Sequence, residues 1–468
     1  MMKRTRLIFL QVACLLFIVF IFRAGYQNFL PASWSQGNQS GFHPFNSLIP
    51  SNTIEINNSQ EVDGASNPVH PDGPWNTTAH IKAILDPTDT ALPRLECPSP
   101  NLIRYEYLKV LAEDNELLEL KYFFALDLRQ SIDILPRLLG SIIETIKFLG
   151  PTACALSIVE GNSDDGTREV LYSLQPKLKD LGIAYYVQSS NIDPKTGERI
   201  GKLAQLRNLA LSPLLSLASS MQDTNPNPSQ SSLMPNTNTT IVFLNDVAIC
   251  ISDILELVHQ RIFQSADMTC AMDWTYVGRD PTFYDVWVAR TLQGDLFFDI
   301  PPDGNWNSAW NLFWNDRITG GRFSRTLPFQ VFACWNGAVA FTAAPILGEQ
   351  SDQDRGDMNR QGKGKKGERI GFRGPREGEC YSGEPTLFCK DLWRTGHGRI
   401  AVVPSVNLEY SDEAASKIKM AKGYTSRWTE REDEDAMRIQ WVNQPPDTVT
   451  CMPGLGDQTR RPWNETFT

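Results

Sequence analysis

Apolar positions along this chain follow two periods, which predict strands that alternate with helices. Runs of consecutive apolar residues, typical of buried strands, occur at Lys121–Leu126, Ala153–Val159, Ile183–Val187 and Ile241–Leu244. Apolar residues at helical spacing separate these runs, at Ile132–Leu149, Asp165–Leu181 and Leu203–Leu217. This order predicts right-handed crossovers and an α/β fold with a mostly parallel sheet flanked by helices. Such a sheet binds ligands at the carboxyl ends of its strands.

The first 23 residues depart from this pattern. Basic residues, among them Lys3 and Arg6, precede the uncharged apolar run Leu7–Phe22, which Arg23 closes. Without a small-x-small cleavage site behind it, this run predicts an uncleaved signal anchor, a single transmembrane helix, rather than a cleaved signal peptide. The basic flank keeps the N-terminus cytosolic. We therefore expect a single-pass type II protein of the Golgi or another secretory-pathway membrane, with its body in the lumen.

Composition divides the rest of the chain. Residues 24–94 are rich in Ser, Asn, Pro and Gly and predict a disordered lumenal stem. A globular domain is expected over residues 95–443, with polar surface insertions near 219–239 and 350–378, and residues 444–468 are expected to form a C-terminal tail. The second insertion contains a short basic run, which we interpret as a solvated loop rather than a phosphate clamp.

Charge and cysteine usage narrow the class of protein. The net charge is −10 and no large basic block occurs, so we expect no nucleic-acid partner. The eight cysteines outside the predicted anchor permit disulfides without revealing their pairing, and none forms a CxxC pair typical of structural zinc. Glycosylation sequons, which agree with a lumenal body, occur at Asn38, Asn57, Asn76, Asn238 and Asn464.

Polar residues follow the first two predicted strands, where such a fold binds its ligands. Asp127 and Arg129 come after the first strand, and Glu160 and Ser163 lie in the Gly- and Asn-containing turn after the second. Glu160 is placed to accept a hydrogen bond from a ribose or a base edge. The alternative is that these residues only cap a turn and the helix behind it.

Two further candidates suit a diphosphate and a metal ion. Arg207 lies on a predicted helix whose other face is apolar, so it either meets a diphosphate through its bidentate fork or forms a surface ion pair. Asn245 and Asp246 follow the fourth strand. Asp246 offers the hard oxygen that Mg²⁺ or Mn²⁺ prefers, and the alternative is a helix cap.

The C-terminal half combines carboxylates with aromatic residues. A pyranose has apolar C–H faces and a polar rim, so this combination suits a sugar, although an aromatic core patch has the same composition. Glu384 begins a predicted helix, either as an acid favoured by the helix dipole or as a carboxylate beside a reacting sugar. The other candidates in this half are Asp273, Trp274, Tyr284, Asp285, Arg290, Trp335 and Asn336.

In combination these motifs resemble known families. The strand that ends at Asp127, the turn Val159–Thr167 and the pairs Arg207-Asn208 and Asn245-Asp246 are similar to GT-A glycosyltransferases, whose sheet is Rossmann-like. The downstream blocks resemble, more narrowly, the fungal capsule-associated α-1,3-mannosyltransferases of the cryptococcal type. These blocks are Ala271–Trp274, Phe283–Arg290, Phe332–Gly337 and Phe388–Trp393. The resemblance covers roughly residues 95–412.

The resemblance implies an enzyme that transfers mannose from GDP-mannose to an α-mannoside acceptor, with retention and an α-1,3 product, in glycan or capsular polysaccharide synthesis. It implies Mn²⁺ or Mg²⁺ at Asp246 and catalytic roles for Glu384 and Asp273. Donor contacts would come from Asp127, Arg129, Glu160, Ser163, Arg207 and Asn245. Acceptor contacts would come from Trp274, Tyr284, Asp285, Arg290, Trp335 and Asn336.

One departure and two alternatives stay open. The usual metal motif of these enzymes is Asp-x-Asp, whereas Asn245-Asp246-Val247 offers one carboxylate, so part of the metal ligand set is unidentified. A transferase that uses a UDP-sugar would need nearly the same residues. A non-catalytic lumenal protein that binds or exports polysaccharide would need only the fold.

Overall fold

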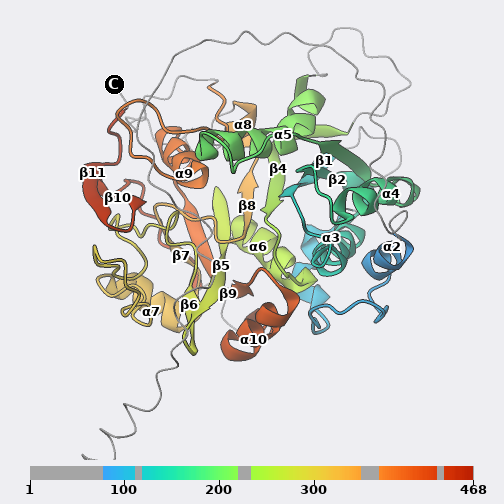
Figure 1. Cartoon of the computed structure of the whole chain (residues 1–468), viewed down its shortest axis with the longest axis horizontal. Helices are drawn as coiled ribbons and strands as arrows, with labels where there is room; N and C mark the ends of the chain where they lie inside the picture. Colours follow the sequence, from blue (N-terminus) through green and yellow to red (C-terminus); the bar gives the residue numbers. More distant parts are fainter. Residues whose placement is uncertain (1–76, 111–118, 220–232, 349–367, 430–436, 467–468) are drawn as a thin grey trace, which may run out of the picture. The chain divides into compact units, whose positions relative to one another are not determined.

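The computed structural model describes residues 77–110, 119–219, 233–348, 368–429 and 437–466 (Figure 1). The chain divides into two compact units, Met1–Val69 and His70–Thr468, and every described residue belongs to the second. The predicted anchor and the stem up to residue 76 lie outside the described residues. Among the helices within these ranges, none is both long and apolar enough to cross a membrane.

A mixed sheet forms the centre of the second unit (Figure 1). The strand order is β3-β2-β1-β4-β8-β5-β9-β7, and β6 pairs with β5 beside this path. The first four strands in this order run parallel to one another. Their bounds are Glu119–Leu128 for β1, Cys154–Glu160 for β2, Ala184–Ser189 for β3 and Met234–Leu244 for β4. They include the four strands that the apolar pattern predicts.

The second half of the sheet corrects the prediction of a mostly parallel sheet. Strand β8 is antiparallel to both of its neighbours, β7 is antiparallel to β9, and β6 is antiparallel to β5. Antiparallel neighbours need no helical crossover, so the sequence shows no strand–helix alternation from which they could be predicted. The bounds are Met268–Val277 for β5, Asp280–Phe283 for β6, Phe329–Gln330 for β7, Ala338–Thr342 for β8 and Ile400–Leu408 for β9.

Helices cover both faces of the sheet. In β1, Phe123 and Ala125 belong to one apolar cluster, and Phe124 and Leu126 belong to the other, as expected for a strand buried on both faces. The first cluster includes residues of α5 (Arg199–Ser219), α8 (Ala344–Leu347) and α9 (Glu384–Arg394). The second includes residues of α3 (Leu135–Leu149), α4 (Thr167–Asp180), α6 (Ile251–Phe263) and α10 (Asp412–Lys422).

Shorter elements complete the described part. Helices α7 (Arg317–Ser324) and α11 (Thr425–Thr429) and the 3₁₀ turns Leu102–Leu108 and Pro151–Ala153 connect the larger elements. Helix α2 (Thr78–Leu85) packs on α3, within the range assigned above to the stem. The hairpin β10 (Thr448–Gly454) and β11 (Asp457–Pro462) occupies the range assigned to a tail. Both ranges therefore contribute ordered structure that their composition does not reveal.

Three disulfides join segments that are distant in sequence. They are Cys97–Cys250, Cys270–Cys334 and Cys380–Cys451. The last one ties the C-terminal hairpin to the segment before α9. Cys154 and Cys389 are buried thiols. Disulfides of this kind persist in oxidising compartments.

A buried ion pair connects α6 to α10. Asp253 and Lys419 are both shielded from solvent, and the Lys419 ammonium group donates to the Asp253 carboxylate. The same carboxylate accepts hydrogen bonds from the Thr425 hydroxyl and from the Cys250 backbone N–H, at 2.9 Å for the latter. These partners compensate the desolvation of the two charges, and removing one charge would leave the other uncompensated.

We expect Lys419→Met to lower the free energy of unfolding by about 3–5 kcal/mol, because the Asp253 charge would lose its buried partner. Lys417→Met is the matched control, since Lys417 lies on the same helix and pairs with Glu413 at the surface. That control should change stability by about 0.5 kcal/mol or less. Urea unfolding followed by circular dichroism measures both variants, and equal effects would contradict the buried pair.

Candidate active site

Candidate residues from several strands meet at one edge of the sheet. Asp127 lies near the end of β1, and Asn245 and Asp246 follow β4. Because β8 is antiparallel to β4, the turn that precedes β8 reaches the same edge, where the Asn245 N–H donates to the Gly337 carbonyl at 2.9 Å. Asn336 and Gly337 in that turn both have positive φ, 55° and 83°. These candidate residues therefore lie at the carboxyl ends of the parallel strands β1 and β4.

Arg207 is the cation of this site. Its side chain extends from α5, is nearly buried, and donates from Nε to Glu384 Oε1 at 2.8 Å. Its Nη1 lies 4.0 Å from Asp127 Oδ1. The guanidinium carbon is 4.3 Å from the centroid of the Trp335 ring, a cation–π contact. Nη1 is buried and forms no hydrogen bond with the described residues, so it can donate to a ligand.

Burial disfavours the charged form of two carboxyls near Arg207, those of Asp127 and Asp246. Burial raises the pKa of Asp127 to about 6, Arg207 opposes this shift, and Glu384 and Asp246 add to it. Burial also raises the pKa of Asp246. Protein atoms surround the Asp246 carboxyl on most sides, yet the residue keeps an exposed surface. Asp246 is thus a carboxylate that a soluble ligand can reach.

A second acidic pair lies on the β5 side of the site. Burial raises the pKa of Asp285 to about 6, although the Asn336 N–H donates to its Oδ2 at 3.1 Å. Asp273 is fully buried, and burial together with the Asp285 charge raises its pKa well above the usual range. The Tyr410 hydroxyl donates to Asp273 Oδ2 at 2.8 Å. The exposed Tyr284 ring meets the Tyr410 ring edge-on at 5.3 Å.

Three predicted donor residues form local contacts instead of joining this cluster. Glu160 is buried and accepts from the Ser163 N–H at 2.6 Å and from the Ser189 hydroxyl at 2.9 Å. Ser163 Oγ accepts from the Gln130 N–H at 2.9 Å. Arg129 pairs with Asp193 at 3.0 Å near the surface. These contacts match the alternative interpretation, a capped turn, in which the side chains stabilise the loop.

Two predicted acceptor residues, Trp274 and Arg290, are buried in the structure. Trp274 is 1% exposed, and its indole N–H donates to Asn407 Oδ1 at 2.8 Å. Arg290 is also 1% exposed and donates to the carbonyls of Thr450, Val286 and Ala289. Both side chains therefore use their donors inside the protein. The sequence around both residues has a composition that fits a sugar site and a protein core equally well.

Trp335 and Asn336 contact the candidate site residues from the protein interior. The Trp335 ring lies under Arg207, and its indole N–H donates to Asn245 Oδ1 at 3.0 Å. The Asn336 amide donates to the Ala271 carbonyl at 2.8 Å. Both residues are buried, so they position Arg207, Asn245 and Asp285 rather than present their own groups to a ligand.

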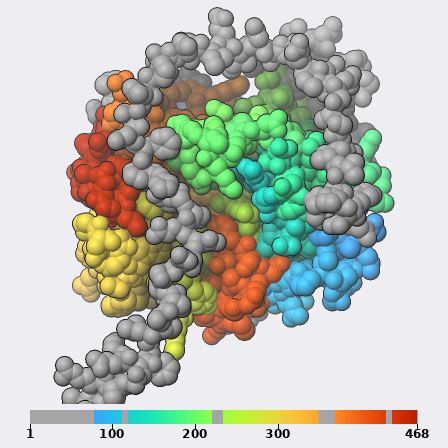
Figure 2. Space-filling model, viewed as in Figure 1, coloured from blue at the N-terminus to red at the C-terminus, as the bar shows by residue number. Residues whose placement is uncertain are grey.

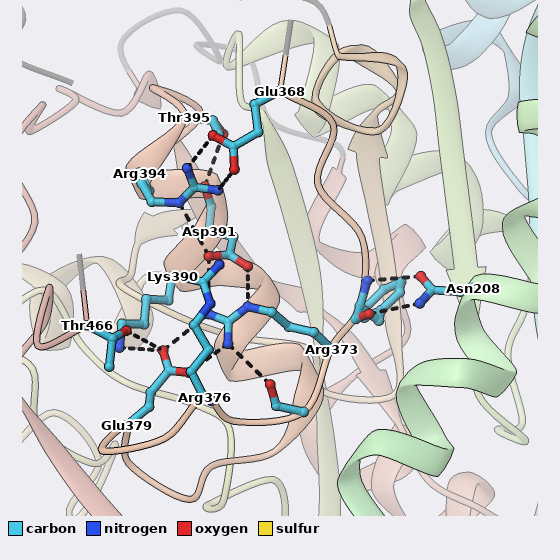
Figure 3. Close-up of polar contacts among 12 residues, drawn as sticks. Asn208, Glu368, Arg373, Arg376, Glu379, Lys390, Asp391, Arg394, Thr395 and Thr466 are labelled. Atoms are coloured by element: carbon cyan, nitrogen blue, oxygen red, sulfur yellow. Dashed lines mark hydrogen bonds and ion pairs between the residues drawn. The ribbon is translucent and has the colours of Figure 1, made fainter. Parts of the chain in front are cut away.

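Sequence reasoning missed the role of residues 368–379, whose polar contacts Figure 3 shows. The Asn208 amide exchanges two hydrogen bonds with the Phe372 backbone, at 2.8 and 2.9 Å. This brings the Phe372 ring to 5.6 Å from the Arg207 guanidinium. Arg373 then pairs with Asp391 on α9 at 2.7 Å and with Glu379 at 2.6 Å. Residues 368–379, assigned largely to a surface insertion, therefore connect the helices that carry Arg207 and Glu384.

Comparisons with known proteins point to one family. Residues 121–391 match the family described as "Cryptococcal mannosyltransferase 1". Over 361 residues, 74% of this chain, the sequence is 33% identical to "Alpha-1,3-mannosyltransferase CMT1" of Cryptococcus neoformans var. neoformans serotype D, of which 71% is covered. The family match includes Asp127, Arg207, Asp246 and Glu384.

Solved structures are more distant. The mannosyltransferase PcManGT of Pyrobaculum calidifontis, in complex with GDP-Man and Mn²⁺, is 12% identical with a TM-score of 0.30, over 72% of this chain and 66% of that one. TarS of S. aureus is 14% identical with a TM-score of 0.33, over 62% of this chain and 36% of that one. In both cases the match spans less than two thirds of the other chain, and at these TM-scores the likeness carries no argument.

The raised pKa of Asp127 predicts how stability depends on pH. The pKa is 3.8 in the unfolded chain and about 6 in the folded protein. Between these values only the unfolded chain releases the proton, so stability falls as the pH rises through this window, by on the order of 3 kcal/mol. Asp127→Asn removes the titration, so its stability relative to the unmodified protein should rise between about pH 4 and about pH 7.

Urea unfolding at a series of pH values measures this difference. Asp280→Asn, at an exposed position of β6, is the control for replacing an aspartate outside the site. A difference between Asp127→Asn and the unmodified protein that does not change with pH would show that the folded-state pKa of Asp127 is not raised.

Proposed function

The chain belongs to the cryptococcal mannosyltransferase 1 family, and we propose that it transfers mannose from GDP-mannose to an α-mannoside acceptor. The proposed product is an α-1,3 linkage formed with retention, within a glycan or a capsular polysaccharide. The observation that carries the proposal is Arg207, buried and paired with Glu384, at the sheet edge where Asp127 and Asp246 meet. A single buried arginine with a spare N–H suits a diphosphate that must be held in one orientation.

The acidic residues around Arg207 support a role for a divalent cation. Carboxylates would repel a nucleoside diphosphate unless a cation lies between them. Among the described residues, no three or more His, Cys, Asp or Glu side chains are grouped so as to hold a metal ion. Mg²⁺ and similar ions are often held by one or two carboxylates together with substrate phosphates. The accessible Asp246 fits that arrangement, so it would hold Mn²⁺ or Mg²⁺ jointly with the donor. A bound ion would neutralise charge on the leaving diphosphate.

Glu384 and Arg207 would act as a unit on the donor. Glu384 begins α9, and its Oε1 fixes the Arg207 fork through Nε. The spare Nη1 of Arg207 would donate to an oxygen of the diphosphate as the glycosidic bond breaks. In the route that we favour, the acceptor hydroxyl attacks from the face of the leaving group, and a diphosphate oxygen takes its proton. Asp127, on the other side of Arg207, would contact the nucleoside.

The acceptor would lie over Tyr284 and Asp285. Tyr284 is exposed and offers an aromatic face to a pyranose, and the Asp285 carboxylate can accept from sugar hydroxyls. Asp273 is buried beneath them and reaches the site through the Tyr410 hydroxyl. We therefore assign Asp273 a positioning role rather than the catalytic role that the resemblance implies.

Two features support a lumenal location in the secretory pathway, which we also propose. Three disulfides require an oxidising compartment. The sequon residues Asn238 and Asn464 are exposed, as glycan attachment requires. The proposed anchor, residues 1–23, would hold the protein as a type II membrane protein.

We expect Asp246→Ala to lower the transfer rate about 100-fold or more, because the donor charge would lose its metal-holding carboxylate. The assay follows trisaccharide formation from GDP-mannose and α-mannobiose with Mn²⁺, by mass spectrometry. Asp280→Ala, an exposed aspartate of β6, is the control and should retain activity.

A panel of donors separates the remaining outcomes of this assay. If product forms with a UDP-sugar and not with GDP-mannose, the UDP-sugar is the donor. No product and no nucleotide binding by the unmodified protein would favour a non-catalytic polysaccharide-binding protein. Full activity of Asp246→Ala would show that Asp246 does not hold the metal ion.

Glu384→Gln keeps the shape of the side chain and removes its charge, so Arg207 loses its ionic partner. We expect kcat to fall about 100-fold with a small change in the KM for the acceptor. Glu413→Gln is the matched control, because Glu413 is also an acid in the first turn of a helix, α10, but lies at the surface. Unchanged kcat in Glu384→Gln would remove Glu384 from the catalytic machinery.

A further inference from the structure

An exposed aromatic surface lies in the segment between β6 and α7. Its sequence, residues 305–316, alternates asparagine with tryptophan: Asn-Trp-Asn-Ser-Ala-Trp-Asn-Leu-Phe-Trp-Asn-Asp. Trp310 is 80% exposed and Trp314 is 49% exposed. Tryptophan side chains are highly buried on average. Two exposed tryptophans four positions apart therefore indicate a binding surface.

The two tryptophans are held outward by residues that are buried next to them. Ala309 and Phe313, each directly before a tryptophan, face the core. The Phe313 ring packs against Phe297 at 4.8 Å and against Phe329 at 4.9 Å, and the Phe313 N–H donates to the Phe297 carbonyl at 2.7 Å. Phe313 also has a φ of 58°, a conformation that costs a non-glycine residue about 1 kcal/mol or more. The packing that imposes this turn fixes Trp314 on the outside.

The C-terminal hairpin supports the same surface. The Gln458 side chain donates to the Ile300 carbonyl at 2.8 Å, and Leu455 packs against Gly304. Figure 2 shows the hairpin (red) next to the segment around α7 (yellow) on the visible face. The surface is therefore part of the folded body and rests on the hairpin that Cys380–Cys451 secures.

The chemistry of this surface suits a neutral sugar chain. Each tryptophan offers an apolar ring face for the C–H groups of a pyranose. Asn307 and Asn311 are exposed, and each amide both donates and accepts hydrogen bonds, as sugar hydroxyls do. Their side chains form no hydrogen bond in the described part of the chain, so they are available to a ligand.

The charge of the segment argues against a membrane as the occupant. Residues 299–316 contain three aspartates and no lysine or arginine. Arg317 follows directly, and Arg460 and Arg461 of the hairpin pair with Asp295 and Glu465. An anionic bilayer binds surfaces that combine aromatic residues with several cations, and aspartates would be repelled by it. A neutral glycan carries no such penalty.

The surface is connected to the acceptor side of the candidate site by packed rings. Phe283, next to Tyr284 in the chain, packs on Phe297 at 4.8 Å, and Phe297 packs on Phe313, next to Trp314. We propose that Trp310 and Trp314, with Asn307 and Asn311, bind a distal part of an extended α-mannose-containing acceptor whose end is elongated beside Tyr284. The identity of this glycan rests on the proposed function, whereas the sugar-binding surface rests on the residues just described.

The test compares a long acceptor with a short one in the double variant Trp310→Ala/Trp314→Ala. With an α-mannan polysaccharide, the variant should raise the KM about tenfold and leave kcat unchanged. With α-mannobiose, which is too short to reach the surface, both constants should stay at the level of the unmodified protein. Ile318→Ala removes a side chain that is 80% exposed nearby, and this control should change neither acceptor. Equal KM values for α-mannan in all three proteins would overturn the proposal.

A second measurement is independent of transfer. In native electrophoresis through a gel that contains α-mannan, the unmodified protein and Ile318→Ala should be retarded, and the double variant should not. This assay measures mannan binding even if the protein transfers no sugar. Failure of the proposed function and failure of this inference are therefore distinguishable. Equal retardation of all three proteins would overturn the inference. Loss of vesicle binding instead of mannan binding in the double variant would overturn it in favour of a membrane surface.

Discussion

The buried contact between Arg207 and Glu384 is the interaction on which the site depends. Carboxyls from β1, β4, β5 and α9 converge at one sheet edge, and burial raises the pKa of several of them. Such a cluster is costly unless a cation offsets it. Arg207 does this from α5 and is itself enclosed by Trp335, Phe243 and Phe372. The aromatic enclosure keeps water away, which strengthens the charge interactions inside.

The remainder of the fold holds the two halves of this contact in register. Helix α5 carries Arg207 and α9 carries Glu384, and 177 residues separate them in the chain. Phe372, joined to Asn208, and Arg373, joined to Asp391, connect the two helices through one short segment. The Cys270–Cys334 disulfide fixes the turn beneath Arg207, and the Cys380–Cys451 disulfide fixes the approach to α9. Positioning therefore comes from residues that touch no ligand.

The side of the site that we propose for the acceptor is built on a different principle. Here Asp285 lies two positions after Phe283 in the chain, and an aromatic series runs from Phe283 through Phe297 to Phe313. Rings at these distances are closely packed, as protein interiors generally are. The series therefore connects the exposed tryptophan surface to Phe283 without a break in packing. This arrangement suits an enzyme that acts on the end of a chain and also holds the chain behind it.

The sequence by itself determined the parallel half of the sheet and the residues at its carboxyl ends, because those signals are local. Apolar runs and helical spacing need only neighbouring residues, so β1 to β4, Asp127, Arg207 and Asp246 follow from them. Only the tertiary structure decided which side chains meet. Trp274 and Arg290 share the composition of a sugar site yet are buried, and Phe372, from a polar segment, packs near Arg207. Whether these side chains are buried or face the site depends on partners far away in the chain. Contacts across such distances produce no periodic pattern in the sequence.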